Sequence, residues 1–565
     1  MIKRWLAYNK DYSILKEMKE ELNISESLAR ILINRDINTL EDAEAFLNPD
    51  MDELEDSFML KGMDSAVERV YKAIKAGEKV CIYGDYDVDG ITSLSMLYLT
   101  LKKLGANVIY YIPNRLEEGY GINIDAIERI IDEGVDLIIS VDCGIRSIEE
   151  VKFINENNKE IIITDHHECG DEIPKACSVI NPHQSDCYYP FKDFAGAGVA
   201  FKLVCALAQR FSRYDLPDDI IDLAALGTVA DVVPLLGENR VIVKNGLEKI
   251  RNNPNLGIKA LTKVSGIDIC AVDTYHISFM LAPRLNAAGR ISDPILGVKL
   301  LIAEEEEAAM KIAEELNKAN SHRQTIENEI LNSAMQIIDK TIDKDIDRII
   351  VAAGENWHIG VIGIVASKLT EKYGLPVVLI SLEDGIGRGS ARSIPGFDLY
   401  EAMNKCSFLF ERFGGHQMAA GLTIKEENIE KLKCLLNEIA WEMMADKHYV
   451  PEIFIDYKID SISMLSQLIE ELEMLEPYGE GNPVPIFVFR GLTIEEMKLL
   501  GNNKHLSMKL NDGTDTIRGI GFNIGFIINY IAVNEKIDII CSVEKNLWNG
   551  TEYIQLNIKD IKKAK

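Results

Sequence analysis

The 565-residue sequence lacks the features that mark membrane, secreted and disulfide-rich proteins. It has no apolar run long enough to span a bilayer, and residues 1–5 show no signal-peptide pattern. Its ten cysteines include no Cys-x-x-Cys pair, so a disulfide framework is not indicated. Cys177, His183 and Cys187 are close in sequence, but their irregular spacing argues against a zinc site. We therefore expect a cytoplasmic protein with reduced thiols and no membrane association.

Positive charge is also scarce, because 61 Lys and Arg residues stand against 90 Asp and Glu, for a formal net charge of -29. This balance argues against a protein that coats nucleic acid nonspecifically. It leaves room for a local basic channel, and acidic residues that hold metals add to the count. The hydrophobic share of 47% is ordinary for a globular protein. The length exceeds one hydrophobic core and predicts three or four domains.

Three carboxylates are concentrated in one short loop. Residues 79–83 are apolar and typical of a strand, whereas residues 91–104 have helical periodicity. Asp85, Asp87 and Asp89 therefore lie between a strand and a helix, where like charges repel unless a cation offsets them. Oxygen ligands of this kind favour hard divalent cations such as Mg²⁺ or Mn²⁺.

The same loop could instead be an EF-hand or a solvated acidic turn. Asp-x-Asp-x-Asp-Gly opens an EF-hand calcium loop, but the closing Glu of that motif would fall at Met96, and a strand replaces the required helix. The solvated turn accounts for the loop taken alone. It does not account for the similar acids that follow later strands.

Further acids and a histidine pair follow the next strands. Residues 135–141 lead into Asp142, and residues 161–163 lead into Asp165-His166-His167. Alternating strands and helices predict a parallel sheet with helices on both faces, and such sheets bind ligands at the carboxyl ends of their strands. Asp231 follows a helix-like segment and adds a further acid. Carboxylates and histidine at one edge indicate a two-metal hydrolytic site.

These segments resemble the four ordered motifs of the DHH phosphoesterase superfamily. The motifs are Gly-Asp-Tyr-Asp-Val-Asp-Gly at 84–90, Ser-Val-Asp-Cys-Gly at 140–144, Thr-Asp-His-His at 164–167 and Gly-Thr-Val-Ala-Asp at 227–231. Segments that resemble the RecJ family of single-strand-specific DNA exonucleases are Leu-Ala-Pro-Arg-Leu-Asn-Ala-Ala-Gly-Arg at 281–290, Trp-His-Ile-Gly-Val-Ile-Gly at 357–363, Gly-Arg-Gly-Ser-Ala-Arg-Ser-Ile-Pro-Gly at 387–396 and Phe-Gly-Gly-His-Gln-Met-Ala-Ala-Gly at 413–421. The match runs from about Trp5 to the C-terminus, without a departure at any motif acid or histidine.

The resemblance implies a site with two Mn²⁺ or Mg²⁺ ions. The implied metal ligands are Asp87, Asp89, Asp142, His166 and Asp231. Asp142 is expected to bridge the ions, Asp85 to support or join the first of them, and His167 to lie beside the scissile phosphate. Histidine among the ligands favours Mn²⁺ over Ca²⁺.

The sequence also contains candidate groups for holding nucleic-acid phosphates. Arg290 closes the 281–290 motif as a candidate catalytic clamp, and Arg115 follows a strand at the same sheet edge as the acids. Each could also form a surface salt bridge. Glycine-rich loops let the backbone approach phosphate closely. Donors in or beside such loops are Arg388, Ser390, Arg392, Gly415 and His416.

We expect an α/β protein with a parallel-sheet DHH catalytic domain, a long linker helix, a second α/β DHH-associated domain and a C-terminal β-barrel of the OB-fold type. The expected divisions are an N-terminal helical segment at 1–75, the catalytic domain at 76–300, a solvated linker helix at 301–345, the associated domain at 346–445 and the barrel at 446–565. From Pro485 onward, 11 Lys and Arg residues outnumber 9 Asp and Glu residues, which suits a groove that tracks a nucleic-acid backbone. Aromatic residues of this region are Phe522, Phe526, Tyr530 and Trp548. They could stack on bases, but for each taken singly we favour a place in the barrel core.

By resemblance, the function is 5′-to-3′ exonuclease hydrolysis of single-stranded DNA to 5′-mononucleotides in DNA repair and recombination. A helicase or a single-strand-binding protein is a candidate partner, and the chain is expected to be a monomer. One alternative is a DHH phosphodiesterase of short oligonucleotides or cyclic dinucleotides, but such enzymes usually lack the barrel and the long linker. The other is a catalytically dead DHH scaffold of a replication complex, which would require eroded motif acids.

Overall fold

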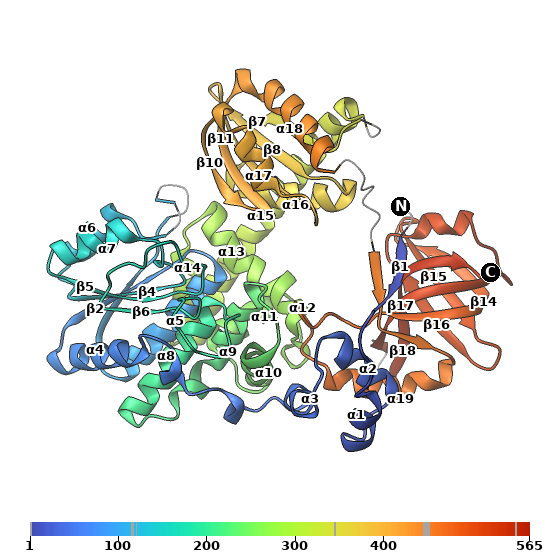
Figure 1. Ribbon diagram of the computed structural model, residues 1–565, viewed down its shortest axis with the longest axis horizontal. Helices are drawn as coiled ribbons and strands as arrows, with labels where there is room; N and C mark the ends of the chain where they lie inside the picture. The colour runs from blue at the N-terminus through green and yellow to red at the C-terminus, as the bar shows by residue number, and fades with distance from the viewer. Residues whose placement is uncertain are drawn as a thin grey trace.

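The computed structural model describes residues 3–114, 118–119, 121–343, 346–444, 452–548 and 551–564. Figure 1 shows the catalytic domain in blue and green, the second α/β unit in yellow and orange above it, and the barrel in red. Within these described ranges, no helix combines the length and apolar character needed to cross a membrane.

The catalytic domain is built on the predicted parallel sheet. Its strands, in spatial order, are β3 (Asn107–Tyr111), β2 (Lys79–Gly84), β4 (Leu137–Val141), β5 (Glu160–Thr164) and β6 (Ser178–Ile180), and every neighbouring pair is parallel. The order reverses between β2 and β4, and in sheets of this kind a crevice for ligands opens at that point.

Helices cover both faces of this sheet and create two apolar clusters. One face packs against α4 (Met63–Ala76), α5 (Val88–Lys103), α8 (Gly196–Phe211) and α9 (Leu216–Ala230). The other face packs against α6 (Ile124–Asp132) and α7 (Ile148–Glu156). The domain continues through α10 (Gly237–Asn252), α11 (Leu256–Val264), α12 (Thr274–His276), a π-helical turn (Ile277–Leu281), α13 (Ala282–Ile291) and α14 (Ile295–Leu301).

The predicted linker is a single 36-residue helix, α15 (Glu306–Thr341), but it is not solvated on all sides. Ala309, Ala313 and Leu316 belong to the catalytic core. Further along the helix, Ile330, Ala334 and Ile338 belong to the core of the second unit. The helix therefore connects the two domains by packing into both of them.

The second unit carries a mixed sheet in the order β10 (Phe410–His416), β11 (Ala419–Lys425), β9 (Ile386–Arg392), β8 (Val377–Glu383) and β7 (Ile350–Glu355). Its β7–β8 pair is parallel and the other pairs are antiparallel. One face packs on α16 (Ile359–Tyr373) and α15, and the other packs on α17 (Leu399–Lys405) and α18 (Ile429–Met443). A second α/β unit is therefore confirmed.

The five predicted C-terminal strands form a closed barrel. They are β14 (Phe487–Leu500), β15 (His505–Asn511), β16 (Thr516–Gly521), β18 (Thr551–Lys563) and β17 (Lys536–Trp548), and β17 pairs back with β14. The β16–β18 pair is parallel, and the other four barrel pairs are antiparallel. The turn at 511–513 joins β15 to β16, whereas the turn predicted at 549–550 lies outside the described residues.

The preference for a core position is wrong for three of the barrel aromatics. Phe522, Phe526 and Tyr530 lie between β16 and β17 and are 52%, 58% and 69% exposed. Aliphatic side chains that alternate along the strands, such as Leu506 and Leu510, fill the barrel instead. The Trp548 side chain lies outside the described residues.

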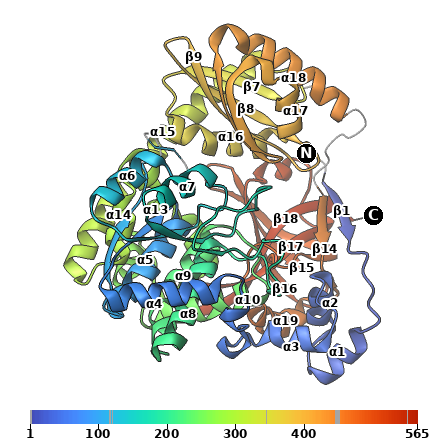
Figure 2. The same ribbon diagram turned by 60° about the vertical axis from the view of Figure 1, so that its left-hand side comes forward.

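The first fifty residues pack against the barrel at the opposite end of the sequence. Strand β1 (Arg4–Ala7) pairs in parallel with β12 (Glu452–Ile455). Helices α1 (Leu15–Glu21), α2 (Glu26–Asn34) and α3 (Leu40–Leu47) share one apolar cluster with β13 (Tyr457–Ile459), α19 (Leu465–Met474) and the barrel. Figures 1 and 2 show these blue elements beside the red strands.

Candidate metal centre

The loop after β2 places its three carboxylates by turning immediately into α5. Asp87 caps the helix, and its Oδ1 accepts a hydrogen bond of 3.1 Å from the backbone N–H of Gly90. A Cβ at Gly90 would lie 2.6 Å from the carbonyl oxygen of Asp85, so a larger residue would displace the loop. Asp85 and Asp89 are both buried, and Asp87 lies between them in the sequence.

The carboxylate of Asp89 is held by the start of α8. Its two oxygens accept hydrogen bonds of 2.7 Å from the backbone N–H groups of Gly196 and Ala197. A helix N-terminus favours a negative charge at this position. Burial nevertheless raises the pKa of Asp89, and the charges of Asp231 and Asp87 raise it further. Asp89 is therefore a pre-positioned carboxylate that a nearby cation would stabilise in its charged form.

Asp142 directly follows β4 and lies in the left-handed backbone region, with φ 59°. A Cβ at Gly196 would lie 2.7 Å from the Cβ of Asp142, so glycine there makes room for this side chain. The Oδ1 atom of Asp142 is buried and accepts no hydrogen bond from any described residue. Burial and the charges of Asp89 and Asp87 raise the pKa of Asp142. An oxygen in this position fits a metal ligand, because no hydrogen bond from the described residues compensates its burial.

His166 faces the carboxylates through one ring nitrogen. Its Nε2 lies 3.2 Å from Asp142 Oδ1, 3.7 Å from Asp231 Oδ2 and 3.8 Å from Asp89 Oδ2. Burial lowers the pKa of His166 to about 4, so the imidazole is neutral at neutral pH. A neutral imidazole is the form of histidine that binds metals.

Asp231 completes the acidic set from the C-terminal end of α9. A Cβ at Gly227, one turn earlier, would lie 2.2 Å from Thr92 Oγ1, so this glycine lets α9 approach α5 closely. Burial and the charge of Asp87 raise the pKa of Asp231 to about 7.

The predicted metal ligands converge into three linked groups. Within each group the candidate ligand atoms lie within 4.8 Å of one another, and the groups are Asp85/Asp87/Asp142, Asp89/His166/Asp231 and Asp142/His166/His167. Asp142 and His166 each belong to two groups. Carboxylate oxygens with one or two imidazole nitrogens match the preferences of Mn²⁺ and Mg²⁺, and such a cation would offset the repulsion that raises the acids' pKa values.

The histidine pair depends on Asp165, which the sequence placed at the strand end without a role. Asp165 is 1% exposed and accepts hydrogen bonds from the backbone N–H groups of Ile145, His166 and His167. Its Oδ1 also lies 2.7 Å from His167 Nδ1. Burial disfavours the charged form of His167, but the hydrogen bond and charge of Asp165 outweigh it and raise the pKa of His167. Its place inside the Asp-His-His motif was the signal that could have identified Asp165.

We expect Asp165→Asn to slow hydrolysis about 10- to 100-fold, the range typical for partners that orient metal-site histidines. An amide is uncharged and has one acceptor oxygen, so it cannot accept hydrogen bonds from the three backbone N–H groups and from His167 Nδ1 as the carboxylate does. His167 therefore loses its fixed ring orientation. Steady-state rates and Mn²⁺ titration measure the two effects separately. A Mn²⁺ affinity that falls as steeply as the rate would make Asp165 part of metal binding instead of a positioning residue.

Arg290 lies where the catalytic domain meets the second unit. It ends α13, and its Nη1 donates a hydrogen bond of 3.1 Å to the carbonyl of Gly360 in the first turn of α16. A Cβ at Gly289 would lie 3.0 Å from the carbonyl oxygen of Tyr86, in the metal loop. Arg290 is therefore held between the metal loop and α16, whereas Arg115 lies outside the described residues.

The other predicted phosphate-binding groups lie on the second unit. The glycine-rich segments that were predicted to be loops are strands β9 and β10 instead. Arg388, Ser390 and Arg392 alternate along β9, so they share one face of the strand. A Cβ at Gly363 of α16 would lie 3.0 Å from Ser390 Oγ and 3.1 Å from Arg392 Nη2, which places these donors against α16. Residues Gly415 and His416 end β10, two strands away in the same sheet.

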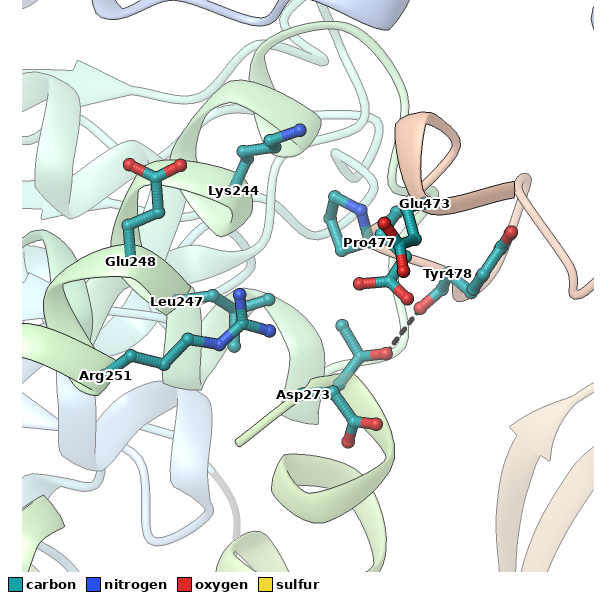
Figure 3. Close-up of a pocket in the computed structure, with 10 residues that line it drawn as sticks. Lys244, Leu247, Glu248, Arg251, Asp273, Glu473, Pro477 and Tyr478 are labelled. Carbon is teal, nitrogen blue, oxygen red and sulfur yellow. Dashed lines mark hydrogen bonds between the residues drawn. The ribbon is translucent and has the colours of Figure 1, made fainter. Parts of the chain in front are cut away.

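Two other features do not belong to this centre. Cys177, His183 and Cys187 appear in none of the candidate metal groups found among the described residues. A cavity of about 180 Å³ lies between α10, the start of α12 and the end of α19, and Figure 3 draws its lining residues, which include Lys244 and Arg251. None of its lining residues is a candidate metal ligand.

Comparisons with known proteins agree with this geometry. The DHH family N-terminal domain matches residues 79–228, the DHHA1 domain matches 347–442 and the RecJ OB domain matches 455–560. The single-stranded-DNA-specific exonuclease RecJ of Bacillus subtilis is 40% identical over 561 residues, which cover 99% of this chain and 70% of the relative.

Solved structures support the same assignment. RecJ of Thermus thermophilus in complex with Mn²⁺ aligns with a TM-score of 0.84 and 31% identity, covering 100% of this chain and 79% of that one. The Mg²⁺ complex from the same organism aligns with a TM-score of 0.80 and 29% identity over 100% of this chain and 78% of that one. The cofactor is Mn²⁺ or Mg²⁺, and the groups described above are the candidates for holding it. The chain belongs to the RecJ family of metal-dependent, single-stranded-DNA-specific exonucleases.

Proposed function

We propose that this protein degrades single-stranded DNA from its 5′ end and releases 5′-mononucleotides, using two divalent ions. The observation that carries this proposal is the convergence of three linked carboxylate–histidine groups at the point where the strand order reverses. When bound, the ions polarise the scissile phosphate and lower the pKa of the attacking water.

Each side chain of the site has a separate role. Asp87, Asp89, Asp142, His166 and Asp231 bind the ions. Asp142 would help to hold both ions, because it belongs to two of the three groups and its carboxylate offers two oxygens. Asp85 supports the first ion from the buried side of the loop. His167, oriented by Asp165, lies beside the scissile phosphate and donates a hydrogen bond to it.

The second unit holds the sugar–phosphate backbone next to the reacting bond. Arg290 lies at the boundary between the two units and acts on charge that grows in the transition state. Groups that bind the flanking phosphates are Arg388, Ser390, Arg392, Gly415 and His416, with Arg115 proposed for the same role from the catalytic domain. Arginine and backbone N–H groups are common partners of nucleic-acid phosphates.

The barrel holds the rest of the strand. A groove of about 1160 Å³ lies between the barrel strands and the segment at 462–466, and its lining includes Lys498, Lys509 and Arg518. Exposed Phe522 and Phe526 lie on the adjoining segment and supply faces on which bases can stack. Basic groups beside exposed aromatics suit binding of a single strand without sequence preference.

Digestion of 5′-labelled and 3′-labelled single strands with Mn²⁺ tests polarity and product, with duplex DNA as the control. We expect a 5′ label to appear at once as a mononucleotide and a 3′ label to remain on progressively shorter strands. Early release of a 3′-labelled mononucleotide would refute the proposed polarity.

Arg290→Ala is expected to lower kcat by about 10²- to 10³-fold, as removal of one transition-state donor does in other enzymes. Mn²⁺ affinity should change little, because a guanidinium does not coordinate Mn²⁺ and Arg290 donates a hydrogen bond to the carbonyl of Gly360. Calorimetric Mn²⁺ titration of the variant is the check. An equal loss of Mn²⁺ binding would make Arg290 a structural residue.

The two alternative functions, a phosphodiesterase of small substrates and an inactive scaffold, are less well supported. The barrel and long helix are present, whereas phosphodiesterases of short oligonucleotides or cyclic dinucleotides usually lack them. All motif acids are present, which argues against an inactive scaffold. We further propose that the enzyme acts as a monomer in the cytoplasm, in DNA repair and recombination, and that a helicase or single-strand-binding protein supplies its substrate.

A further inference from the structure

The sheet of the second unit has one face that its helices cover only in part. Figure 1 shows β10 and β11 side by side at one edge of this sheet. Leu379 of β8 packs against α16, and Ser390 of β9, which pairs with Leu379, lies on the same face. Helices α17 and α18 pack against the opposite face. Pairing through β11 puts Arg412, Gly414 and His416 of β10 on the α16 side, where all three are exposed.

The register of the three strands arranges this open face in rows. Residues that pair directly across strands share a face, and Thr423 of β11 pairs with Arg412 on one side and with Arg388 on the other. The members of the next row, two residues further along each strand, are Gly414, Gly421 and Ser390. Rows on one face are about 7 Å apart, so a group bound in one row is within reach of arginine side chains in the next.

The glycine row forms a trough between the side chains of its neighbours. A Cβ at Gly414 would meet no atom of the described residues within 4 Å, and one at Gly421 would meet only the carbonyl oxygen of Gly389, at 4.0 Å. Ser390, which lies next to α16, closes the trough at its β9 end. A phosphate bound at Ser390 therefore has open space beside it, toward the row of Arg412.

The row of Arg412 and Arg388 carries positive charge that the protein does not compensate. Both residues are exposed, and neither forms an ion pair or a hydrogen bond with another described residue. No member of this row or of the glycine row is acidic. The whole chain has 90 Asp and Glu residues against 61 Lys and Arg residues, so two arginines without acidic partners favour an anionic ligand.

The proposed function places one end of the substrate beside this row. In a strand that is cut after its first nucleotide, the phosphate on the 5′ side of the cut is the terminal 5′-phosphate. Ser390 and Arg392 lie against α16, whose first turn accepts the hydrogen bond of Arg290, so these two residues suit that phosphate. Groups attached to the 5′-phosphate then extend over the trough to Arg388 and Arg412.

We propose that Arg412, Thr423 and Arg388 bind the β- and γ-phosphates of single strands that begin with a 5′-triphosphate. This inference rests on the proposed function and deepens it, because it adds a class of substrate. Strands of this kind arise wherever synthesis starts from a nucleoside triphosphate. The trough gives the two additional phosphates room, and the guanidinium groups compensate their charge.

The bond that is cut does not change with the additional phosphates. Water attacks the phosphorus between the first two nucleotides, and the bond from that phosphorus to the 3′ oxygen of the first nucleotide breaks. The 3′ oxygen takes up a proton, and the attacked phosphate becomes the new 5′ end of the shortened strand. The first product is therefore a nucleoside 5′-triphosphate, and all later products are 5′-mononucleotides.

The test compares two strands of the same sequence, one with a 5′-monophosphate and one with a 5′-triphosphate, in the presence of Mn²⁺. Wild type should release one nucleoside triphosphate from each triphosphorylated strand, as measured by anion-exchange chromatography, with a KM at or below that for the monophosphorylated strand. Arg412→Gln should raise the ratio of the two KM values, triphosphate over monophosphate, by about 10-fold, as expected for the loss of one hydrogen bond to a charged group.

Two further variants complete the design. Arg412→Lys keeps the charge but loses the planar guanidinium, and it should restore part of the wild-type KM ratio. Lys431→Gln removes the same charge from α18, where Lys431 lies over the Phe408 ring on the other side of the sheet. This control variant should keep the wild-type ratio.

The outcomes separate the inference from the proposed function. If wild type releases no mononucleotides from monophosphorylated 5′ ends, the proposed function falls. If wild type digests the monophosphorylated strand but leaves the triphosphorylated strand intact, only the inference is overturned. It is also overturned if Arg412→Gln raises both KM values equally, because the row then binds a phosphodiester of the strand, or if its KM ratio equals that of Lys431→Gln. If Arg412→Gln is inactive on both strands, the ratio for Arg412→Lys decides.

Discussion

Asp142→Ala is expected to lower the rate of hydrolysis by about 10³-fold or more at saturating Mn²⁺, since metal stabilisation of transition-state charge contributes several kcal/mol. Asp142 is the carboxylate that two of the three candidate ligand groups share. Its buried Oδ1 accepts no hydrogen bond from the described residues, so a cation is the partner that its position fits. Removing it leaves the other acids to repel one another without a bridge.

Hydrolysis rates test this prediction, while calorimetric Mn²⁺ titration and thermal unfolding report the metal affinity and the stability of the variant. Asp136→Ala is the matched control, because Asp136 directly precedes β4, at the opposite end from Asp142, and pairs with Lys159 at the surface. EDTA should abolish wild-type activity and leave the residual rate of Asp142→Ala almost unchanged. Wild-type turnover by Asp142→Ala would disprove the two-metal assignment.

The elements that carry the proposed metal ligands could be predicted because their sequence patterns are local. Buried β4 is apolar apart from Ser140 and leads directly into Asp142, and the carboxyl ends of parallel strands meet at one edge. The barrel strands alternate and are punctuated by turns, so their existence and type followed from residues close in sequence.

Long-range contacts could not be predicted in the same way. The backbone donors that hold Asp89 belong to Gly196 and Ala197, more than a hundred residues later in the sequence. No periodic pattern of residues indicates this contact. The pairing of β1 with β12 joins opposite ends of the sequence. Exposure of Phe522 was missed because an aromatic residue near a strand has the same local pattern whether it faces the core or solvent.

The same contacts change how the barrel should be studied. Cutting the chain near residue 446 would remove β12, α19 and the barrel, and would expose the buried faces of α2 and α3. Point substitutions at the junction between the catalytic domain and the barrel are therefore better probes than truncation.

Arg240 provides such a probe, because its guanidinium joins three parts of the molecule. It projects from α10, is 1% exposed and stacks 3.8 Å above the centre of the Phe46 ring. The backbone carbonyls that accept its hydrogen bonds are those of Phe46, Met474, Leu475, Glu476 and Pro477. Burial lowers the pKa of Arg240 to about 9, so the side chain remains charged at neutral pH.

Arg240→Met should lower the free energy of unfolding by about 1–3 kcal/mol, because its hydrogen bond to the Phe46 carbonyl is buried, whereas its bonds to the carbonyls of Met474 and Glu476 are only partly buried. Asn482 also donates to the carbonyls of Leu475 and Pro477, so the loss falls on the other three. Chemical denaturation measures the change, with Arg210→Met at an exposed ion pair as the control, expected within about 1 kcal/mol of wild type. Because the barrel is docked through this side chain, we expect a larger loss of activity on long strands than on dinucleotides. Equal denaturation midpoints for Arg240→Met and wild type would show that the apolar contacts of the junction suffice without the guanidinium.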